Sequence, residues 1–354
     1  MNNVTKIGLS ALAGSLAMVS ANAVEYTMSG GAMSTFSTAK GDGINIVNAD
    51  NGKGFGHATD LGFTAEGELD NGFTVKYFMS VDTNAALANT SSQMTLGMGS
   101  LGTIQLNNIA GSKANGIDDI SPNAYNEVWD GLTADTDTTT SNNPSFFGSS
   151  TGSGSIDYRI PAQEYMGVTL NASYTYDPQA DSGGAAKGDV AAYAASTGSG
   201  DAITLQLAHE SGIEIGGGYE EVDDTQGLVG ADNTSRATGY VKYAAGGLTV
   251  SYQESYQNTQ VLLASAASGK DIESEITGIA YTAGNVTISY GEASIQTKAV
   301  SATAALAEIE LESIQAAYVM GAMTVSAAMS ETSNPSGVLG DKYEESTLAV
   351  SFAF

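Results

Sequence analysis

The chain has 354 residues, no cysteine and a formal net charge of −27, from 12 Lys and Arg against 39 Asp and Glu. The lack of cysteine excludes disulfides and thiolate metal sites, and the acidic balance argues against nucleic-acid binding and favours cations near the protein. Hydrophobic residues make up 42% and glycines number 43 against 5 prolines, which suits twisted, half-polar strands better than helices.

The first 23 residues predict a secretory signal peptide. Lys6 supplies the positive start, Ile7 to Val19 form a short apolar run, and Ala21-Asn22-Ala23 has the small-x-small pattern of a cleavage site. The run is too short to span a bilayer as a helix, and no later segment is apolar enough to do so. We therefore expect an exported protein whose mature chain, residues 24–354, begins at Val24.

A period of two predicts β-strands along the mature chain. The first is expected from Val24 to Phe36, followed by a Gly/Asn-rich loop through about His57. A hairpin then turns at Asp70-Asn71-Gly72, where Asn-Gly supplies the positive φ of a tight turn. The bulky residues that alternate with polar ones on its two strands are Leu61, Phe63, Ala65, Leu69, Phe73, Val75, Tyr77, Met79 and Val81.

The same rhythm recurs to the end of the chain. Three similar hairpins span residues 240–252, 279–290 and 318–326, each with a small-residue turn followed by an x-Thr-x-Ser strand and with tyrosines beside the turn. The segments number roughly 16, at ~10 residues each, and short turns alternate with longer loops. An even number of strands places both chain ends on one side, so the strand at Val24 is expected to pair with the strand that ends at Phe354.

The last strand alternates strictly between bulky and small side chains. Leu348, Val350, Phe352 and Phe354 lie on one face, and the chain stops on an aromatic residue. An edge strand of a soluble sandwich is the alternative for this stretch alone, but a sandwich gives no reason for short turns to alternate with long loops. We predict an all-β fold, a single-domain transmembrane antiparallel β-barrel of sixteen strands.

The alternation fails once, in a long loop of about residues 108–152. A loop of this length tends to be functional or disordered. Its first half carries apolar residues suited to packing against a wall: Ile117, Ile120, Tyr125, Val128, Trp129 and Leu132. Its acidic residues include Asp118, Asp119, Glu127, Asp130, Asp135 and Asp137.

Two features resemble a known family. The strand ending in Phe352 and Phe354 resembles the carboxy-terminal strand of Gram-negative outer-membrane proteins, whose terminal Phe the barrel-assembly machinery recognises. The layout, with a long loop after the fifth strand, resembles the general porins and most closely the sixteen-stranded alphaproteobacterial porins. The resemblance implies a homotrimer in the outer membrane, among lipid and lipopolysaccharide. It also implies a long third loop folded into the lumen and passive diffusion of small hydrophilic solutes.

In that family the loop narrows the pore to a constriction, and its placement implies an acidic set formed by Asp118, Asp119, Glu127 and Asp130. The alternation places the candidate basic residues of the opposing wall on the lumen face: Lys76, Arg159 and Lys242. The chain departs from the family pattern of several clustered arginines, because it has only Arg159 and Arg236. A thin basic wall against an acidic loop predicts cation preference. The alternative for the carboxylates is an exposed, solvated extracellular loop.

Other functions find less support in the sequence. The histidines are His57, expected in the first loop, and His209, on the outward phase, so no inward Ser-His-Asp set forms and an enzyme is not predicted. No firm metal site or cofactor is predicted. The acidic loop offers oxygen ligands for Ca²⁺ but lacks the spacing of an EF-hand, so this signal is weak.

Two alternatives to general diffusion concern the lumen. A substrate-specific sugar channel would need a row of inward aromatics, and Phe78 and Tyr240 are isolated. A structural or adhesive barrel would need a filled interior, but inward positions are mostly Thr, Ser, Gly, Ala and Asn, and side chains alone do not fill so wide a barrel. An open general diffusion channel is the preferred prediction.

Overall fold

The computed structural model describes residues 24–43, 51–82, 88–108, 111–130, 144, 146–148, 154–178, 198–223, 233–259, 262–263, 266–267, 270–299 and 306–354. The predicted signal peptide lies outside these residues, as do Leu132, Asp135 and Asp137. Within the described ranges, no helix has the length and apolar character needed to cross a membrane.

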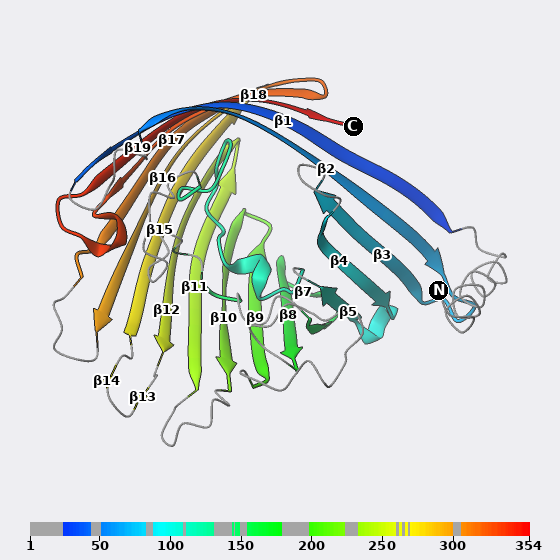
Figure 1. The fold of residues 1–354 in the computed structure, drawn as a ribbon. Coiled ribbons are helices and arrows are strands. Elements are labelled where there is room, and N and C mark those ends of the chain that lie inside the picture. The colour runs from blue at the N-terminus through cyan, green and yellow to red at the C-terminus, as the bar shows by residue number, and fades with distance from the viewer. Residues whose placement is uncertain are drawn as a thin grey trace, which may run out of the picture.

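One antiparallel sheet curves round and closes on itself (Figure 1). Its strands in chain order are β1 (Glu25–Asp42), β2 (Gly52–Glu68), β3 (Thr74–Asp82), β4 (Ala88–Gly97), β5 (Thr103–Asn108), β6 (Ile156–Arg159), β7 (Gln163–Tyr165), β8 (Val168–Asp177), β9 (Gly200–His209), β10 (Ile213–Val222), β11 (Thr234–Ala245), β12 (Leu248–Thr259), β15 (Lys270–Ala283), β16 (Val286–Ala299), β17 (Ile309–Met320), β18 (Met323–Ser333) and β19 (Lys342–Ala353).

Sixteen strand positions make up this wall in the described residues. The sheet has 17 segments, but β6 and β7 both pair with β8, on either side of a break that contains Pro161, so they occupy one position. A proline has no N–H for the ladder, which explains the interruption. The pair β13 (Leu262–Leu263) and β14 (Ala266–Ala267) is separate from the wall. The predicted sixteen-stranded antiparallel barrel is confirmed.

The two ends of the chain seal the barrel. β1 pairs antiparallel with β19, from Gly31 opposite Ala353 to Asp42 opposite Lys342. Beyond that ladder, the backbone N–H of Gly30 donates to the carbonyl of Phe354 at 2.8 Å and the N–H of Phe354 donates to the carbonyl of Gly30 at 2.9 Å. Closure pairs the edge strands that would otherwise expose unpaired backbone groups.

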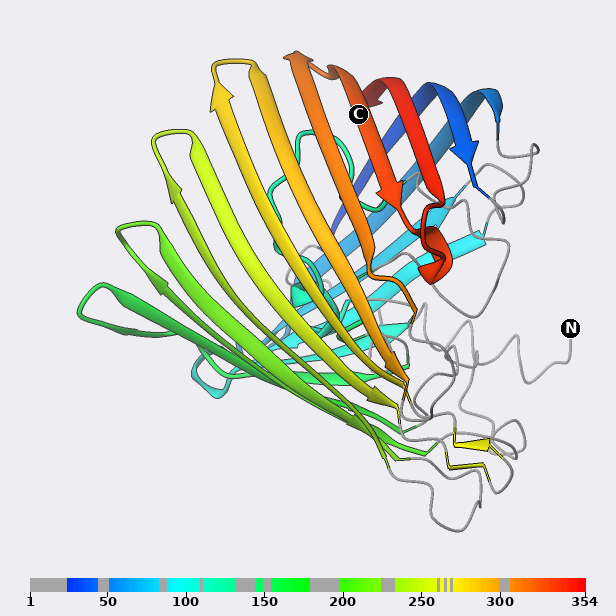
Figure 2. The same cartoon turned by 90° about the vertical axis from the view of Figure 1, so that its left-hand side faces the viewer.

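Tight turns lie together at one end of the barrel, as Figure 2 shows for the hairpins of β9 to β18. Asn71 and Gly72 form one of these turns: Gly72 has φ +82° and the Asn71 side chain accepts from the N–H of Phe73 at 3.1 Å. The longer connections join the opposite strand ends. This asymmetry confirms the predicted alternation of short turns and long loops.

Bulky side chains point away from the barrel axis, and small or polar ones point inward. On β19, Leu348 is 51% and Phe352 50% exposed, whereas the intervening Ala349 is 2% exposed. On β9, Ile203 is 57% exposed and Thr204 is 3% exposed. An outer surface with this many bulky apolar side chains suits hydrocarbon, because the closed ladder satisfies the backbone polar groups internally.

Two boundaries expected from the sequence are wrong. β1 continues past Phe36 to Asp42, and β2 already begins at Gly52, so His57 lies within a strand and not in a loop. Residues after Phe36 are small or polar and do not alternate, so they carry no strand pattern of their own. Pairing with β19 on one side and β2 on the other extends the ladder through them.

Candidate functional site

A segment from the long loop, residues 111–130, lies inside the barrel against the inward faces of β12, β16 and β17 (Figure 1). We call it the inner segment. Gln253 of β12 holds its first part: the side-chain amide donates to the carbonyls of Ile117 at 2.9 Å and Asp118 at 3.0 Å. The Gln253 side-chain oxygen accepts from the N–H of Ile120 at 3.1 Å, and this residue is only 1% exposed.

Two further strands hold the middle of the inner segment. Ser289 of β16 accepts from the N–H of Ala124 at 2.9 Å. Gln315 of β17 accepts from the N–H of Tyr125 at 2.8 Å and donates to the carbonyl of Asn126 at 2.6 Å. These side chains satisfy backbone groups that have no ladder partner, so the segment keeps an irregular path along the wall without leaving polar groups unpaired.

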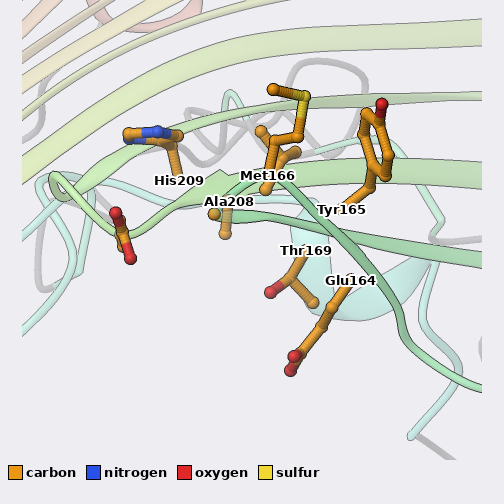
Figure 3. A pocket seen from close by; sticks show the side chains of 9 residues that line it. Glu164, Tyr165, Met166, Thr169, Ala208 and His209 are labelled. Atoms are coloured by element: carbon orange, nitrogen blue, oxygen red, sulfur yellow. The ribbon is translucent and has the colours of Figure 1, made fainter.

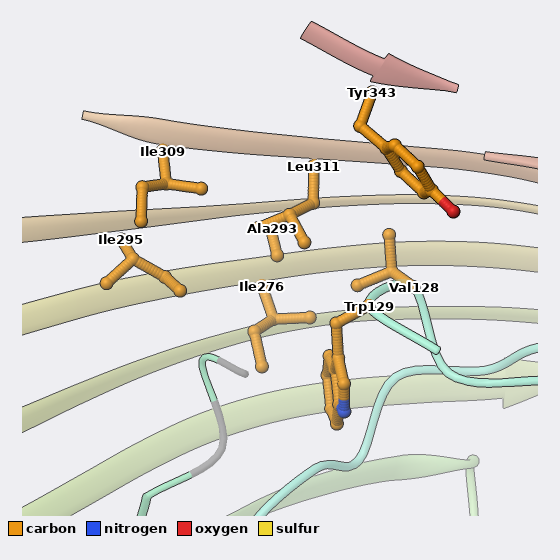
Figure 4. Packing of buried hydrophobic residues seen from close by; sticks show 8 residues of the cluster. All are labelled: Val128, Trp129, Ile276, Ala293, Ile295, Ile309, Leu311 and Tyr343. Carbon is orange, nitrogen blue, oxygen red and sulfur yellow. The ribbon is translucent and has the colours of Figure 1, made fainter. Parts of the chain in front are cut away.

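An apolar cluster inside the barrel anchors the end of the inner segment (Figure 4). Val128 and Trp129 are 4% and 8% exposed and pack with residues of four strands. Those residues are Ile276, Ala293, Ile295, Ile309, Leu311 and Tyr343. The sequence did not predict this inward apolar patch, because it favoured small and polar residues at inward positions. It did predict that apolar residues of the loop would pack against a wall, and Val128 and Trp129 do so.

A second anchor holds the described residues nearer the end of the loop. The backbone N–H of Gly148 donates to the fully buried Glu220 at 3.1 Å, and Arg236 pairs with the same carboxylate at 3.2 Å. Phe147, 1% exposed, rests on Gly218, where a Cβ would stand 2.4 Å from its ring. A larger residue at position 218 would displace that ring.

The four predicted acidic residues all belong to the inner segment, in the stretch from Asp118 to Asp130. Their carboxylates lie close enough for the charge of one to raise the pKa of another. Burial raises the pKa of Glu127 to about 7, with further increases from the charges of Asp130, Asp119 and Asp118. Burial raises the pKa of Asp119 to about 6, opposed by the hydrogen bond from the N–H of Ser121. Burial also raises the pKa of Asp130. Among the described residues, no ion pair is formed by Asp119, Glu127 or Asp130.

The three predicted basic residues are not brought together. Lys76 on β3 pairs with Glu66 at 2.5 Å, and Lys242 on β11 pairs with Glu214 at 3.3 Å. Arg159 on β6 pairs with Asp157 at 2.6 Å and also donates to the carbonyl of Gly111 at 3.0 Å, at the start of the inner segment. Each positive charge is therefore compensated by a carboxylate of the wall.

Neither histidine belongs to a catalytic arrangement. His57 is exposed on the outer surface and bonds Ser34 Oγ at 3.0 Å. His209, at the turn end of β9, lines a shallow pocket with Glu164, Tyr165 and Met166 (Figure 3), and its ring nitrogen bonds Ser211 Oγ at 2.8 Å. In the part of the chain that the structure describes, no group of three or more His, Cys, Asp or Glu is placed to hold a metal ion.

The sequence missed the residues that position the inner segment. These residues are Gln253, Gln315 and the pair of Glu220 and Arg236. The hydrogen bonds from Gln253, Gln315 and Glu220 to the loop backbone join residues that are 72 to 190 positions apart in the chain. A signal was present: each is a long polar side chain at an inward position of a strand, with Ser, Thr or Gly at one or both of the adjacent inward positions. Such side chains extend from the wall into the lumen, where their polar groups need hydrogen-bond partners.

Comparisons with known proteins agree with this geometry. Residues 8–354 match the family described as Gram-negative porin. No curated protein matches the chain. The anion-selective porin from Comamonas acidovorans is similar in structure, with a TM-score of 0.64, 12% identity, and coverage of 94% of this chain and 100% of that one. The trimer form of OmpT from Vibrio cholerae has a TM-score of 0.61, 10% identity and coverage of 94% and 100%.

A porin mutant from Rh. blastica is also similar, with a TM-score of 0.53 and 13% identity. It covers 93% of this chain and 100% of its own length. At these identities the structural likeness shows the barrel fold, and the family match rests on the sequence.

Proposed function

Because the chain belongs to the Gram-negative porin family, we propose that this outer-membrane diffusion channel prefers cations and that its inner segment forms the constriction. The protein is a non-enzymatic general porin of the Gram-negative outer membrane. Membership in the family leaves the sign of the preferred ion open. The charges of the described residues support the proposal.

One observation carries it: Asp119, Glu127 and Asp130 lie close together on a segment inside the barrel, without a basic partner among the described residues. The lumen-facing Lys76, Arg159 and Lys242 are each paired with a carboxylate, so they add little net positive charge. At an effective dielectric constant near 20, one carboxylate attracts a monovalent cation about 6 Å away by about 3 kcal/mol before screening. Several unpaired carboxylates at one narrow place therefore outweigh a compensated basic wall.

The anchors support a fixed constriction. Gln253, Ser289 and Gln315 hold the inner segment from three different strands, and the cluster around Trp129 holds its end. A segment attached at so many points keeps its carboxylates at a constant position. Fixed charge at a fixed distance from the passing ion is what charge selection in a water-filled pore requires.

We further propose a homotrimer, because porin relatives form trimers, as the Vibrio cholerae OmpT structure illustrates. The same proposal includes kinship with the alphaproteobacterial porins, cleavage of residues 1–23 and contact with lipopolysaccharide. So is recognition of Phe352 and Phe354 by the assembly machinery. The apolar outer surface, with Phe354 63% exposed at its edge, supports the last two points.

The test is the zero-current potential of the purified channel in a planar bilayer under a salt gradient. We expect the sign of cation preference. The variant Asp118→Asn, Asp119→Asn, Glu127→Gln and Asp130→Asn is expected to lose most of that preference while keeping conductance. A potential that indicates anion preference in the unmodified protein, or an unchanged potential in the variant, would contradict the proposal.

A matched control removes the same number of charges from the outer surface. Glu275, Glu292, Glu310 and Glu312 lie on outward positions of β15, β16 and β17 and are exposed. Changing all four to Gln alters the net charge of the protein equally but leaves the inner segment intact. We expect nearly the original selectivity from this control, because charges outside the barrel are separated from the pore by the wall and are screened by salt.

A further inference from the structure

A cavity of about 170 Å³ lies between the inner segment and the inward face of the strands at which the two ends of the chain meet. We call it the seam pocket. Tyr125, Asn126 and Asp130 of the inner segment line one side of it. The strands β1, β18 and β19 line the other side with Thr35, Ser37, Ala328, Ser330, Glu345 and Thr347.

The strand register explains why the wall is hollow here. Ala328 of β18 lies opposite Gln315 of β17 on one side and opposite Thr347 of β19 on the other. Gln315 extends to the inner segment, whereas Ala328 has only a methyl group, so space remains above it. The inner segment crosses this space: Gln315 holds it on one side, and Tyr125 Oη donates to Met33 Sδ of β1 at 3.7 Å on the other.

The charged groups that line the seam pocket are both acidic. Glu345, at an inward position of β19, and Asp130 form no ion pair among the described residues. Burial raises the pKa of the Tyr125 phenol, and the charges of Glu345 and Asp130 raise it further, so both carboxylates lie near this ring. No Lys, Arg or His in the described part of the chain lines the pocket. An occupant with a positive charge is therefore favoured.

Hydroxyl groups beside these carboxylates favour an occupant that donates hydrogen bonds. Thr347 Oγ1 donates to Glu345 at 2.9 Å, so Ser37 Oγ is the donor to Thr347 Oγ1 at 2.7 Å. Ser330 Oγ bonds Ser313 Oγ at 2.9 Å. A hydroxyl has one donor and two acceptor sites, so these groups have acceptor sites to spare once their own hydrogens are used.

The size of the seam pocket distinguishes an organic cation from a bare ion. One water takes about 30 Å³ of the liquid, so the cavity holds more than a single water or ion. In the ranges that the structure describes, no group of three or more His, Cys, Asp or Glu is placed to hold a metal ion. The ring of Tyr125 adds an aromatic surface, which attracts ammonium groups.

We propose that the seam pocket binds a small organic cation that carries an ammonium group and several hydroxyl groups, such as a protonated amino sugar. The ammonium group binds the carboxylates of Glu345 and Asp130, and the hydroxyl groups of the solute donate to Ser37 and Thr347. The inference rests on the cation channel proposed above and names a class of solute that this channel retains. Asp130 also belongs to the proposed constriction, whereas Glu345 belongs to the pocket alone.

Isothermal titration calorimetry on the purified protein in detergent tests the site near neutral pH with three probes. Glucosamine hydrochloride supplies the ammonium group, and glucose and N-acetylglucosamine have a similar ring without a positive charge. We expect glucosamine to bind at one site per chain and the two neutral sugars to give no saturable heat. No saturable binding of glucosamine, or equal binding of glucose, would overturn the proposal.

Two variants change the pocket in different ways. Glu345→Gln removes one charge and keeps the shape, whereas Ala328→Leu fills the hollow and keeps both charges. Each should weaken the binding of glucosamine about tenfold or more. Glu312→Gln, at an exposed outward position of β17, is the matched control and should bind like the original. Unchanged affinity in Glu345→Gln or in Ala328→Leu would overturn the proposal, because the cation would then bind elsewhere on this acidic protein.

Bilayer recordings on the same preparations separate this inference from the proposed function. Glu345→Gln leaves the four acidic residues of the inner segment in place, so it should keep most of the cation preference measured in potassium chloride. A cation-preferring channel that does not bind glucosamine refutes the seam pocket as a binding site and leaves the channel proposal intact. A protein that binds glucosamine through Glu345 but prefers anions in the bilayer supports the pocket and refutes the proposed selectivity.

Discussion

Glu127 and Asp119 are the residues through which pH should act on this pore. Burial raises the pKa of Glu127 to about 7 and that of Asp119 to about 6, so both bind protons in a range where ordinary carboxyls stay ionised. Both are charged at about pH 8 and largely neutral at about pH 5. We expect cation preference to fall as pH is lowered through this window, measured as a shrinking zero-current potential at a constant salt gradient.

The control for this prediction removes one titrating group. Glu127→Gln should have a lower cation preference at about pH 8 and a smaller further loss on acidification. The outer-surface variant at Glu275, Glu292, Glu310 and Glu312 should keep the full pH response. A potential that stays constant in the original protein between about pH 8 and pH 5 would show that these carboxylates do not face the ion path.

The inner segment is the element whose position matters most, and Trp129, the single tryptophan of the chain, reports on it. Its ring is 8% exposed in an apolar cluster inside the barrel. Gln315→Ala removes partners from the N–H of Tyr125 and the carbonyl of Asn126, at a cost of about 1–3 kcal/mol in docking free energy. We expect the fluorescence of Trp129 to shift to the red and the single-channel current to become noisier.

Gln296→Ala provides the comparison, because Gln296 is a glutamine on the exposed outer face of β16. It removes the same chemical group without touching the inner segment, so the emission of Trp129 should be unchanged. Equal spectra for Gln315→Ala and Gln296→Ala would mean that the apolar cluster alone holds the segment. In that case the hydrogen bonds from Gln315 would only satisfy backbone groups of the inner segment and would not hold it in place.

The strands were predictable where a period of two and a turn occur together, as at Asn71-Gly72 and in the three later hairpins. The far half of β1 was not predictable, because residues between Phe36 and Asp42 are small and polar and alternate in no clear way. Their extended conformation comes from two neighbouring strands, one of which, β19, lies at the other end of the chain. Long-range pairing overrides weak local preference there.

The candidate site divides in the same way. The acidic set of Asp118, Asp119, Glu127 and Asp130 was implied by the resemblance to the porin family, through the place of the long loop in the strand order, and its role at the constriction stays a prediction. Its anchors were not predictable, because Gln253 and Gln315 act on backbone groups 133 and 190 residues away. The pairing of each basic residue with a wall carboxylate also depends on strand register. Register was readable only beside a tight turn, as for Lys76 and Glu66.

At the scale of the whole barrel, the fold depends on a seam between the two ends of the chain. β1 and β19 pair along residues 31–42 and 342–353, and Phe354 adds two backbone hydrogen bonds with Gly30. The ring of Phe354 also covers Gly30, where a Cβ would stand 2.7 Å from it. Because the long ladder remains without the last residue, Phe354 contributes only the end of the seam. Any large effect of its loss must therefore arise elsewhere.

Deleting Phe354 separates closure from recognition. Refolded in detergent, the shortened chain loses two backbone hydrogen bonds, about 1–3 kcal/mol, and should still form a heat-modifiable barrel. In cells we expect a much larger loss of outer-membrane barrel, because the assembly machinery is predicted to bind the terminal aromatic. Phe354→Ala keeps the backbone bonds and should fold in detergent like the original, yet assemble poorly in cells. If both variants assembled in cells as efficiently as they refold in detergent, the terminal Phe would be a part of the seam and not an assembly signal.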